Sequence, residues 1–344
     1  MERRKFIRNS SLLSAGIVSG VSYPNPFTSY KDAIIGHNSH QYKIDLQWGA
    51  LNSNFYPVDD CHEMVQDSQG RILMLTNHTK NNVIVYDKSG KLLEVWGTDY
   101  PGAHGLTLSV ENGEDVLYIA DNSRHEVIKT TIKGEVLQVF EYPKESGKYK
   151  TKESYVPTET AIAPNGDVYI ADGYGEQYIM HYNAKGELLH VFGGKGEEDN
   201  LFNNAHGICL DTRDAANPTL LITARQQNKL KRFSLAGEYL STIDLPGAYI
   251  CRPVIHGTDI YLATIWSGDG SEGTGFISIL NEKNELVSAP GGCNPIYTDG
   301  KLSPMYQALN VFHHPHDVCV DDDENLYVAQ WNSGKTYPIK LYRV

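Results

Sequence analysis

The chain has 344 residues, of which 40% are hydrophobic, and its 22 tyrosines outnumber its phenylalanines and tryptophans together. This composition is ordinary for a soluble protein, and the abundant tyrosine and glycine favour β-strands joined by turns. The formal net charge of −12 repels phosphate backbones, so we expect no nucleic-acid partner. The five cysteines show no CxxC spacing, and we interpret Cys209 and Cys319, in apolar strands, as free buried thiols rather than disulfide partners or metal ligands.

The N-terminal residues predict an export signal rather than a folded element. Arg3 and Arg4 are followed by Phe6 and Ile7, and then by a mildly apolar stretch over residues 11–21. This pattern is typical of a twin-arginine signal, which we place over residues 1–22, followed by a linker over 23–40. The alternative is a chance arginine pair. The signal predicts a bacterial protein that is periplasmic or secreted, and the stretch is too short to remain as a membrane span.

From residue 41 onward the chain repeats with a period of about 40 to 50 residues, each unit holding four short strands. The third unit is the clearest, with strands over 160–163, 168–172, 178–182 and 188–192. The pattern resembles NHL-type repeats and predicts an all-β fold, a six-bladed β-propeller over 41–344. The sixth unit stops after three strands, and residues 42–49 resemble the missing fourth strand, so we expect an N-terminal strand to close the ring. An open β-solenoid is the alternative.

Histidines open the second, fourth and sixth units, at His104, His206 and His316. Alternate blades of a six-bladed ring lie about 120° apart, so these side chains can converge on the axis. Three imidazoles that leave a coordination position open are typical of a catalytic zinc site. His62 occupies the same position in the first unit, and it could be a fourth ligand, a substrate contact or a spectator. A blade that simply prefers histidine at this position is the structural alternative.

The order of these motifs resembles the catalytic core of the peptidyl-α-hydroxyglycine α-amidating lyases, a family of six-bladed propellers with zinc and structural calcium. The resemblance implies Zn²⁺ on the three histidines, a catalytic tyrosine at Tyr174 and an active-site arginine at Arg225. It also implies Ca²⁺ bound by Asp317 and by the backbone carbonyl of Leu106.

The chain departs from the family at several positions. Asn77 stands where the family has a second arginine, His314 stands where it has a methionine, and Gly175 replaces a disulfide cysteine. The metal scaffold therefore matches better than the substrate contacts do. The roles of His62, His313 and His314 are left open.

The implied function is zinc-dependent cleavage of a C–N or C–O bond at a hydroxylated carbon of a peptide-like or other small substrate. Zinc would act as a Lewis acid, Tyr174 would take or relay a proton once a nearby cation lowers its pKa, and Arg225 would orient a carboxylate. The alternative from another class is a non-catalytic propeller that binds a periplasmic glycan, peptide or protein. The sequence leaves the natural substrate and the oligomeric state open.

Overall fold

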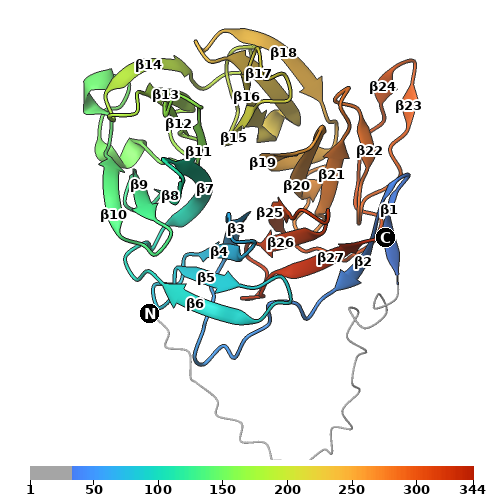
Figure 1. The fold of residues 1–344 in the computed structure, drawn as a ribbon. Helices are drawn as coiled ribbons and strands as arrows, with labels where there is room; N and C mark the ends of the chain where they lie inside the picture. The colour runs from blue at the N-terminus through green and yellow to red at the C-terminus, as the bar shows by residue number, and fades with distance from the viewer. Residues whose placement is uncertain (1–32) are drawn as a thin grey trace, which may run out of the picture.

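The computed structural model describes residues 33–344 (Figure 1). The export signal expected over 1–22 lies outside the described residues. Within residues 33–344 the regular structure consists of β-strands and three short 3-10 helices: η2 (Lys144–Ser146), η3 (Lys152–Ser154) and η4 (Arg225–Gln227). No helix in this part of the chain combines the length and the apolar character needed to cross a membrane.

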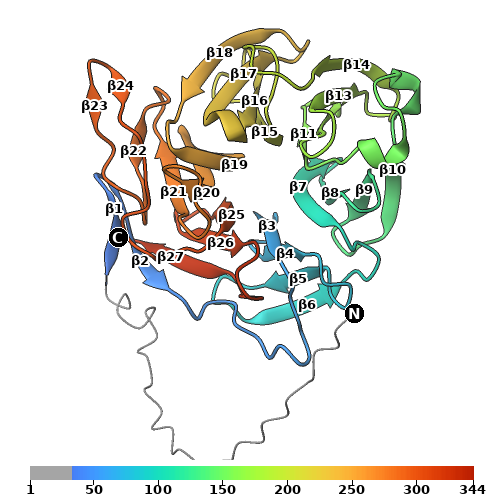
Figure 2. The same ribbon diagram turned by 180° about the vertical axis from the view of Figure 1, so that it is seen from behind.

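Six antiparallel sheets are arranged in a ring around a central axis, as Figures 1 and 2 show from the two faces, which confirms the predicted six-bladed propeller. Blade one comprises β3 (Cys61–Gln66), β4 (Ile72–Thr76), β5 (Val83–Tyr86) and β6 (Leu92–Trp96). Blade two comprises β7 (Ala103–Glu111), β8 (Glu114–Asp121), β9 (Glu126–Thr131) and β10 (Val136–Phe140). Blade three comprises β11 (Glu159–Ile162), β12 (Val168–Ala171), β13 (Tyr178–Tyr182) and β14 (Leu188–Gly193).

The remaining three blades complete the ring. Blade four comprises β15 (Ala205–Asp211), β16 (Thr219–Ala224), β17 (Lys229–Ser234) and β18 (Tyr239–Asp244). Blade five comprises β19 (Ala248–His256), β20 (Asp259–Ser267), β21 (Phe276–Leu280) and β22 (Leu286–Ser288), and is followed by a separate hairpin of β23 (Tyr297–Thr298) and β24 (Lys301–Leu302). Blade six comprises β25 (Pro315–Val320), β26 (Leu326–Gln330), β27 (Ile339–Arg343), β2 (His40–Asp45) and β1 (Ile34–His37).

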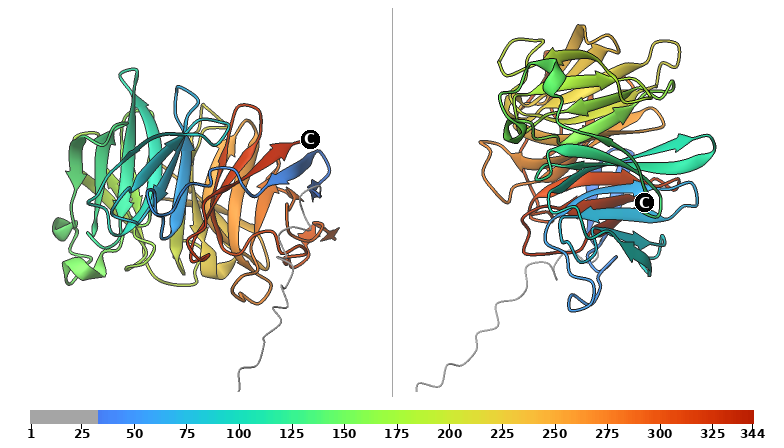
Figure 3. Two further views of the ribbon diagram at one scale, coloured as in Figure 1. Left: turned by 90° about the horizontal axis from the view of Figure 1, so that it is seen from below. Right: turned by 90° about the vertical axis from the view of Figure 1, so that its left-hand side faces the viewer.

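The N-terminal strand closes the ring as the repeat pattern predicted. In blade six, β2 pairs antiparallel with β27, and Ile44 lies opposite Leu341. The strand β1 adds a fifth, outer strand, so the sheet begins at Ile34, before residue 41 where we expected the propeller to start. The innermost strands β3, β7, β11, β15, β19 and β25 contact one another in a closed cycle around the axis. Figure 3 shows the ring from the side, with the strands of each blade running between its two faces.

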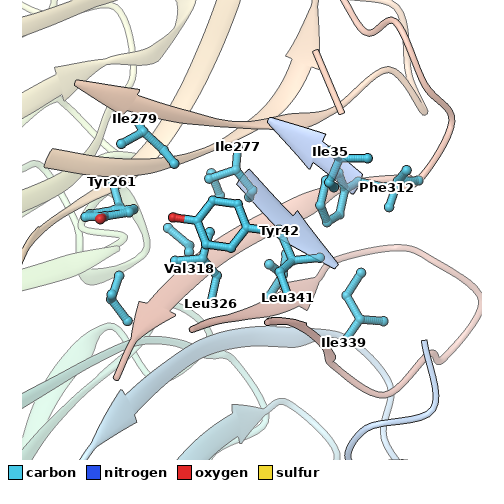
Figure 4. Close-up of a cluster of buried hydrophobic side chains, with 14 of the residues drawn as sticks. Ile35, Tyr42, Tyr261, Ile277, Ile279, Phe312, Val318, Leu326, Ile339 and Leu341 are labelled. Carbon is cyan, nitrogen blue, oxygen red and sulfur yellow. The ribbon is translucent and has the colours of Figure 1, made fainter. Parts of the chain in front are cut away.

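The burial of a strand depends on its position within the blade. The second strands are buried on both faces because neighbouring blades pack against each other there; every residue of β4 and of β12 is buried. The outer strands β6 and β14 instead expose residues at their middle positions. The closing strands contribute Ile35 and Tyr42 to a cluster between blades five and six (Figure 4). Hydrophobic burial between blades therefore holds the ring together and keeps the inner strands in place.

Replacing Leu341 with alanine should test this closure. The side chain is fully buried in the cluster that joins the N-terminal strands to blade six. Loss of its methyl groups is expected to lower the free energy of unfolding by about 2 to 5 kcal/mol, measured by urea denaturation. The neighbouring Tyr342 is 39% exposed, so Tyr342→Ala serves as the control and should cost about 0.5 kcal/mol or less. Equal losses in the two variants would contradict the closure by this cluster.

Candidate functional site

Four histidines open inner strands at positions where the strand pairing is irregular. In β7, Ala103 pairs with Asp121 and Gly105 pairs with Ala120, so His104 between them has no partner. A β-bulge of this kind turns a side chain away from its regular direction. The same irregularity occurs at His62 in β3, at His206 in β15 and at His316 in β25. The bulges explain why these imidazoles point into the channel mouth.

The glycines that follow two of these histidines let neighbouring blades come close. A Cβ atom on Gly105 would lie 2.4 Å from the carbonyl oxygen of Thr158 in the next blade. A Cβ atom on Gly207 would lie 2.6 Å from the Cα atom of Arg252. Such distances are far below van der Waals contact, so only glycine permits this approach. In each His-Gly pair, the bulge therefore turns the imidazole toward the channel mouth, and the glycine lets the inner strands of neighbouring blades approach closely.

The four imidazoles form one buried group at the channel mouth. The ring centroids of His104 and His316 lie 4.8 Å apart, and each of these rings lies 4.8 or 4.9 Å from those of both His62 and His206. None of the four side chains is more than 5% exposed. The structure thus brings together the three predicted ligands and adds the fourth histidine, whose role was left open.

Backbone carbonyls orient two of these rings. The Nδ1 atom of His104 lies 2.9 Å from the carbonyl oxygen of Thr158, and the Nδ1 atom of His316 lies 3.0 Å from that of His62. A carbonyl can only accept, so both Nδ1 atoms carry the proton and both Nε2 atoms present a lone pair. The Nε2 atom of His316 is buried with no hydrogen-bond partner. This arrangement, with one nitrogen held and the other free, is typical of metal-binding histidines.

All four histidines are neutral at physiological pH. Burial lowers the pKa of His62 to about 3. Burial, followed by the neighbouring imidazole of His62, lowers the pKa of His104 well below its usual value. Burial also lowers the pKa of His206 and of His316, and the guanidinium of Arg225 adds to both effects. Neutral imidazole is the form that binds a metal ion.

The metal-free protein should therefore lose stability in mild acid. The pKa of each of these histidines is lower in the folded protein than in the unfolded chain, where it is about 6.5, so protons bind preferentially to the unfolded chain. The contribution of each neutral histidine to the free energy of unfolding is fully present above about pH 6.5. Below that pH it should fall by about 1.4 kcal/mol per pH unit for each histidine. Urea midpoints of metal-free protein between about pH 7.5 and 5.5 measure this slope. The variant His206→Ala should show a smaller slope, and an unchanged slope would contradict the assignment.

Tyr174 places its hydroxyl against two of the histidines. It follows Gly173 in the turn after β12, where a Cβ atom on the glycine would lie 2.4 Å from the carbonyl oxygen of Ala205. The hydroxyl oxygen lies 3.1 Å from the Nε2 atoms of both His104 and His206. Burial of this hydroxyl raises the pKa of Tyr174, and Arg225 opposes that effect without reversing it. Arg225 by itself therefore does not bring the pKa of Tyr174 below its ordinary value, and the residue as a whole is 41% exposed.

Arg225 is a buried cation beside Tyr174. It begins η4, directly after β16, and is 5% exposed. Its Nη2 atom lies 3.4 Å from the hydroxyl of Tyr174, and its guanidinium lies 5.4 Å from the ring of Trp266. Its Nε atom has no hydrogen-bond partner, and among residues 33–344 no carboxylate forms an ion pair with it. An uncompensated buried guanidinium is suited to bind an anionic group of a ligand.

The donor atoms of the group fit a zinc ion. Two sets of ligand atoms lie within 4.8 Å of one another: one from His62, His104 and His316, and one from His206, Cys251 and His316. Neither set is the predicted one of His104, His206 and His316, although His316 belongs to both. Imidazole nitrogens and a cysteine sulfur are the ligands that zinc prefers. No role was predicted for Cys251, whose pKa burial raises to about 11. Its place in the bulge of β19, in line with the histidines, was the signal that could have found it.

The oxygens expected to bind calcium contact an arginine instead. The Nη2 atom of Arg252 lies 2.7 Å from Oδ2 of Asp317, and its Nη1 atom lies 2.8 Å from the carbonyl oxygen of Leu106. No role was predicted for Arg252. A calcium ion and the guanidinium would compete for the same oxygens, so these residues as arranged do not fit the ion.

Three further residues singled out in the sequence lie outside the histidine group. The Oδ1 atom of Asn77 accepts from the backbone N–H of Asp60, and its Nδ2 atom donates to the Asp60 carboxylate. His314 uses both ring nitrogens, with Nε2 accepting from the N–H of Gly273 and Nδ1 donating to the carbonyl oxygen of Asn332. The ring of His313 packs on that of His314, with centroids 4.2 Å apart. These contacts give His314 a structural part and leave no free nitrogen on it.

Comparisons with known proteins agree with this architecture. No family model matches the chain. It is 28% identical over 293 residues to peptidyl-alpha-hydroxyglycine alpha-amidating lyase 1 of Drosophila melanogaster, covering 74% of this chain and 47% of that protein. It is 23% identical over 180 residues to NHL repeat-containing protein 3 of Homo sapiens, covering 50% of this chain and 51% of that protein. The chain thus spans about half the length of these curated relatives.

Solved structures share the fold at low sequence identity. A gluconolactonase from Xanthomonas campestris superposes with a TM-score of 0.60 and 11% identity, covering 90% of this chain and 95% of that one. A streptogramin B lyase superposes with a TM-score of 0.54 and 17% identity, covering 83% of this chain and 94% of that one. Together with the ring of six blades, these findings show that the chain is a six-bladed β-propeller that is similar in sequence to NHL repeat proteins and to the peptidyl-α-hydroxyglycine α-amidating lyases.

Proposed function

We propose that the protein is a zinc-dependent lyase that cleaves a C–N bond at a hydroxylated carbon of a small, carboxylate-bearing, peptide-like substrate. A peptidyl-α-hydroxyglycine, which yields a peptide amide and glyoxylate, is the parent case, and a C–O bond at an equivalent carbon is the variant. The export signal predicted at Arg3 and Arg4 would place this activity in the periplasm or outside the cell.

One observation carries the proposal. The hydroxyl of Tyr174 lies 3.1 Å from Nε2 of His104 and 3.1 Å from Nε2 of His206, and the uncompensated guanidinium of Arg225 lies 3.4 Å from it. A proton-carrying group, nitrogen ligands and an anion-binding group thus meet at one point. This is the combination that a metal-assisted proton transfer next to a carboxylate requires.

His104, His206 and His316, whose ring centroids lie 4.8 or 4.9 Å apart, would hold the zinc ion. His62 and Cys251 would be neighbouring donors, since each shares a set of converging ligand atoms with His316. When bound, zinc would supply Lewis acidity to the substrate hydroxyl and make it easier to deprotonate. Arg225 would bind the substrate carboxylate and fix the hydroxylated carbon beside Tyr174.

Proton balance defines the part of Tyr174. The substrate hydroxyl loses a proton, the C–N bond breaks, the O–C bond becomes a carbonyl, and the departing amide nitrogen gains a proton. The oxygen of Tyr174 can accept the first proton and deliver one to the nitrogen, so the phenol ends protonated. Its raised pKa favours that resting form. Because the Tyr174 ring is 41% exposed, this relay lies at the open mouth of the channel.

Incubation of the zinc-loaded protein with a peptide ending in α-hydroxyglycine tests the proposal directly. We expect glyoxylate release above the uncatalysed rate, measured by coupled oxidation of glyoxylate. Asn77 offers no second positive charge for the carboxylate, so activity toward a longer or different hydroxylated substrate should be compared in the same assay. Full zinc occupancy without cleavage of any such compound would favour the non-catalytic binding propeller.

A further inference from the structure

We propose that the guanidinium of Arg252 takes the place of a divalent cation inside the ring, so that this propeller holds its inner strands together without calcium. The inference does not depend on the proposed lyase activity. It rests on the contacts of one buried side chain, 8% exposed, in the bulge of β19.

Arg252 is bound to oxygens from three other blades. From blade six, Asp317 accepts from Nε at 3.1 Å and from Nη2 at 2.7 Å. From blade two, the carbonyl oxygen of Leu106 accepts from Nη1 at 2.8 Å, and from blade one, the carbonyl oxygen of Met64 accepts from Nη2 at 3.0 Å. One side chain of blade five therefore links inner strands around the ring.

Two further carboxylates complete the surroundings. The Oε2 atom of Glu63 lies 3.6 Å from Nη1 of Arg252, and the Oε2 atom of Glu159, in blade three, lies 3.8 Å from its Nε. Both glutamates are 1% exposed and Asp317 is fully buried.

Carboxylate and carbonyl oxygens from several strands are the ligands that a hard divalent cation prefers. Without any positive charge among them, three buried carboxylates would be strongly destabilising. Arg252 supplies that charge with directional donors that satisfy the same oxygens. Gly207 in blade four provides the space, because a Cβ atom there would lie 2.6 Å from the Cα atom of Arg252.

The wild-type protein offers the first test. Protein stripped of metal with EDTA and refilled with zinc alone should have the same melting temperature with and without millimolar CaCl₂. Metal analysis after dialysis should find no calcium. About one calcium per chain, together with a calcium-dependent rise in melting temperature, would overturn the proposal. Neither readout depends on catalysis, and the zinc content of the same samples reports separately on the histidine group.

The second test removes the built-in cation. Arg252→Ala is expected to lower the melting temperature by roughly 10 °C, and millimolar calcium should recover most of the loss because the freed oxygens can then bind the ion. Arg213→Ala is the matched control, since Arg213 pairs with the buried carboxylate of Asp211 outside the channel. Calcium should not rescue that variant. A loss in Arg252→Ala that calcium leaves unchanged would contradict the assignment, and the wild-type measurement stands if the variant does not fold.

Discussion

Replacing His206 with alanine should remove zinc from the protein while leaving the propeller folded. His206 is one of the neutral, buried imidazoles at the mouth of the channel, and its Nε2 atom lies 3.1 Å from the hydroxyl of Tyr174. Loss of a direct ligand should weaken zinc binding by more than the roughly 10- to 100-fold that loss of a supporting residue costs. The zinc content after dialysis, by plasma emission spectroscopy, should fall from about one per chain to a small fraction of that value.

The matched control is His181→Ala. His181 lies on β13, stacks on Tyr169 and bonds to Asp167, away from the channel. This variant should keep its zinc. His62→Ala then separates the roles left open for His62: a fourth ligand would be needed for full zinc affinity, whereas a spectator would not. Unchanged zinc content and unchanged chelator kinetics in His206→Ala would refute the metal centre.

Replacing Tyr174 with phenylalanine should leave zinc in place and abolish most turnover. The change removes only the hydroxyl that lies between His104 and His206 and beside Arg225. A positioned proton-transfer group contributes about 10²- to 10⁴-fold to a rate, so kcat for glyoxylate release should fall by about that factor with KM little changed. Steady-state glyoxylate release over a range of hydroxyglycine-peptide concentrations gives kcat and KM, and zinc content is measured in parallel.

Tyr142→Phe provides the comparison for loss of a phenol elsewhere. Its hydroxyl donates to the carbonyl oxygen of Tyr149, outside the histidine group, and its activity should match that of the wild type. A kcat in Tyr174→Phe within a few fold of the wild type would exclude the tyrosine from proton transfer. Loss of zinc in this variant would instead assign the hydroxyl to the support of the metal.

The ring and its closure were predictable because repeats constrain a propeller strongly. A period with four strands defines a blade, and a last unit with three strands requires a fourth from elsewhere, which β2 supplies. The position of each residue within its blade was also predictable, and this is why His104, His206 and His316 are found together. The repeat pattern thus predicts which positions face the axis.

The contacts of long side chains were not predictable in this way. Arg252 lies in blade five, the unit that matches the repeat least, and nothing in its sequence position shows that its guanidinium reaches Asp317 and Leu106. Cys251 was also missed, although it occupies the position in its unit that histidine occupies in other units. The contacts of Asn77 could not be predicted either, because its hydrogen bonds to Asp60 depend on a loop whose path the repeat does not define. A pattern of strands predicts backbone neighbours, whereas side-chain partners across the ring depend on reach and direction.

The pairing of β2 with β27 has a consequence for the order of folding. Almost the whole described chain separates these two strands, and such non-local contacts form slowly because a long loop must close first. Until β27 is available, β2 has an unpaired edge and Tyr42 lacks Leu341 and the rest of its buried surroundings. His316 belongs to the same final blade. The histidine group should therefore be complete only when the ring closes, so that acquisition of metal would report the last step of folding.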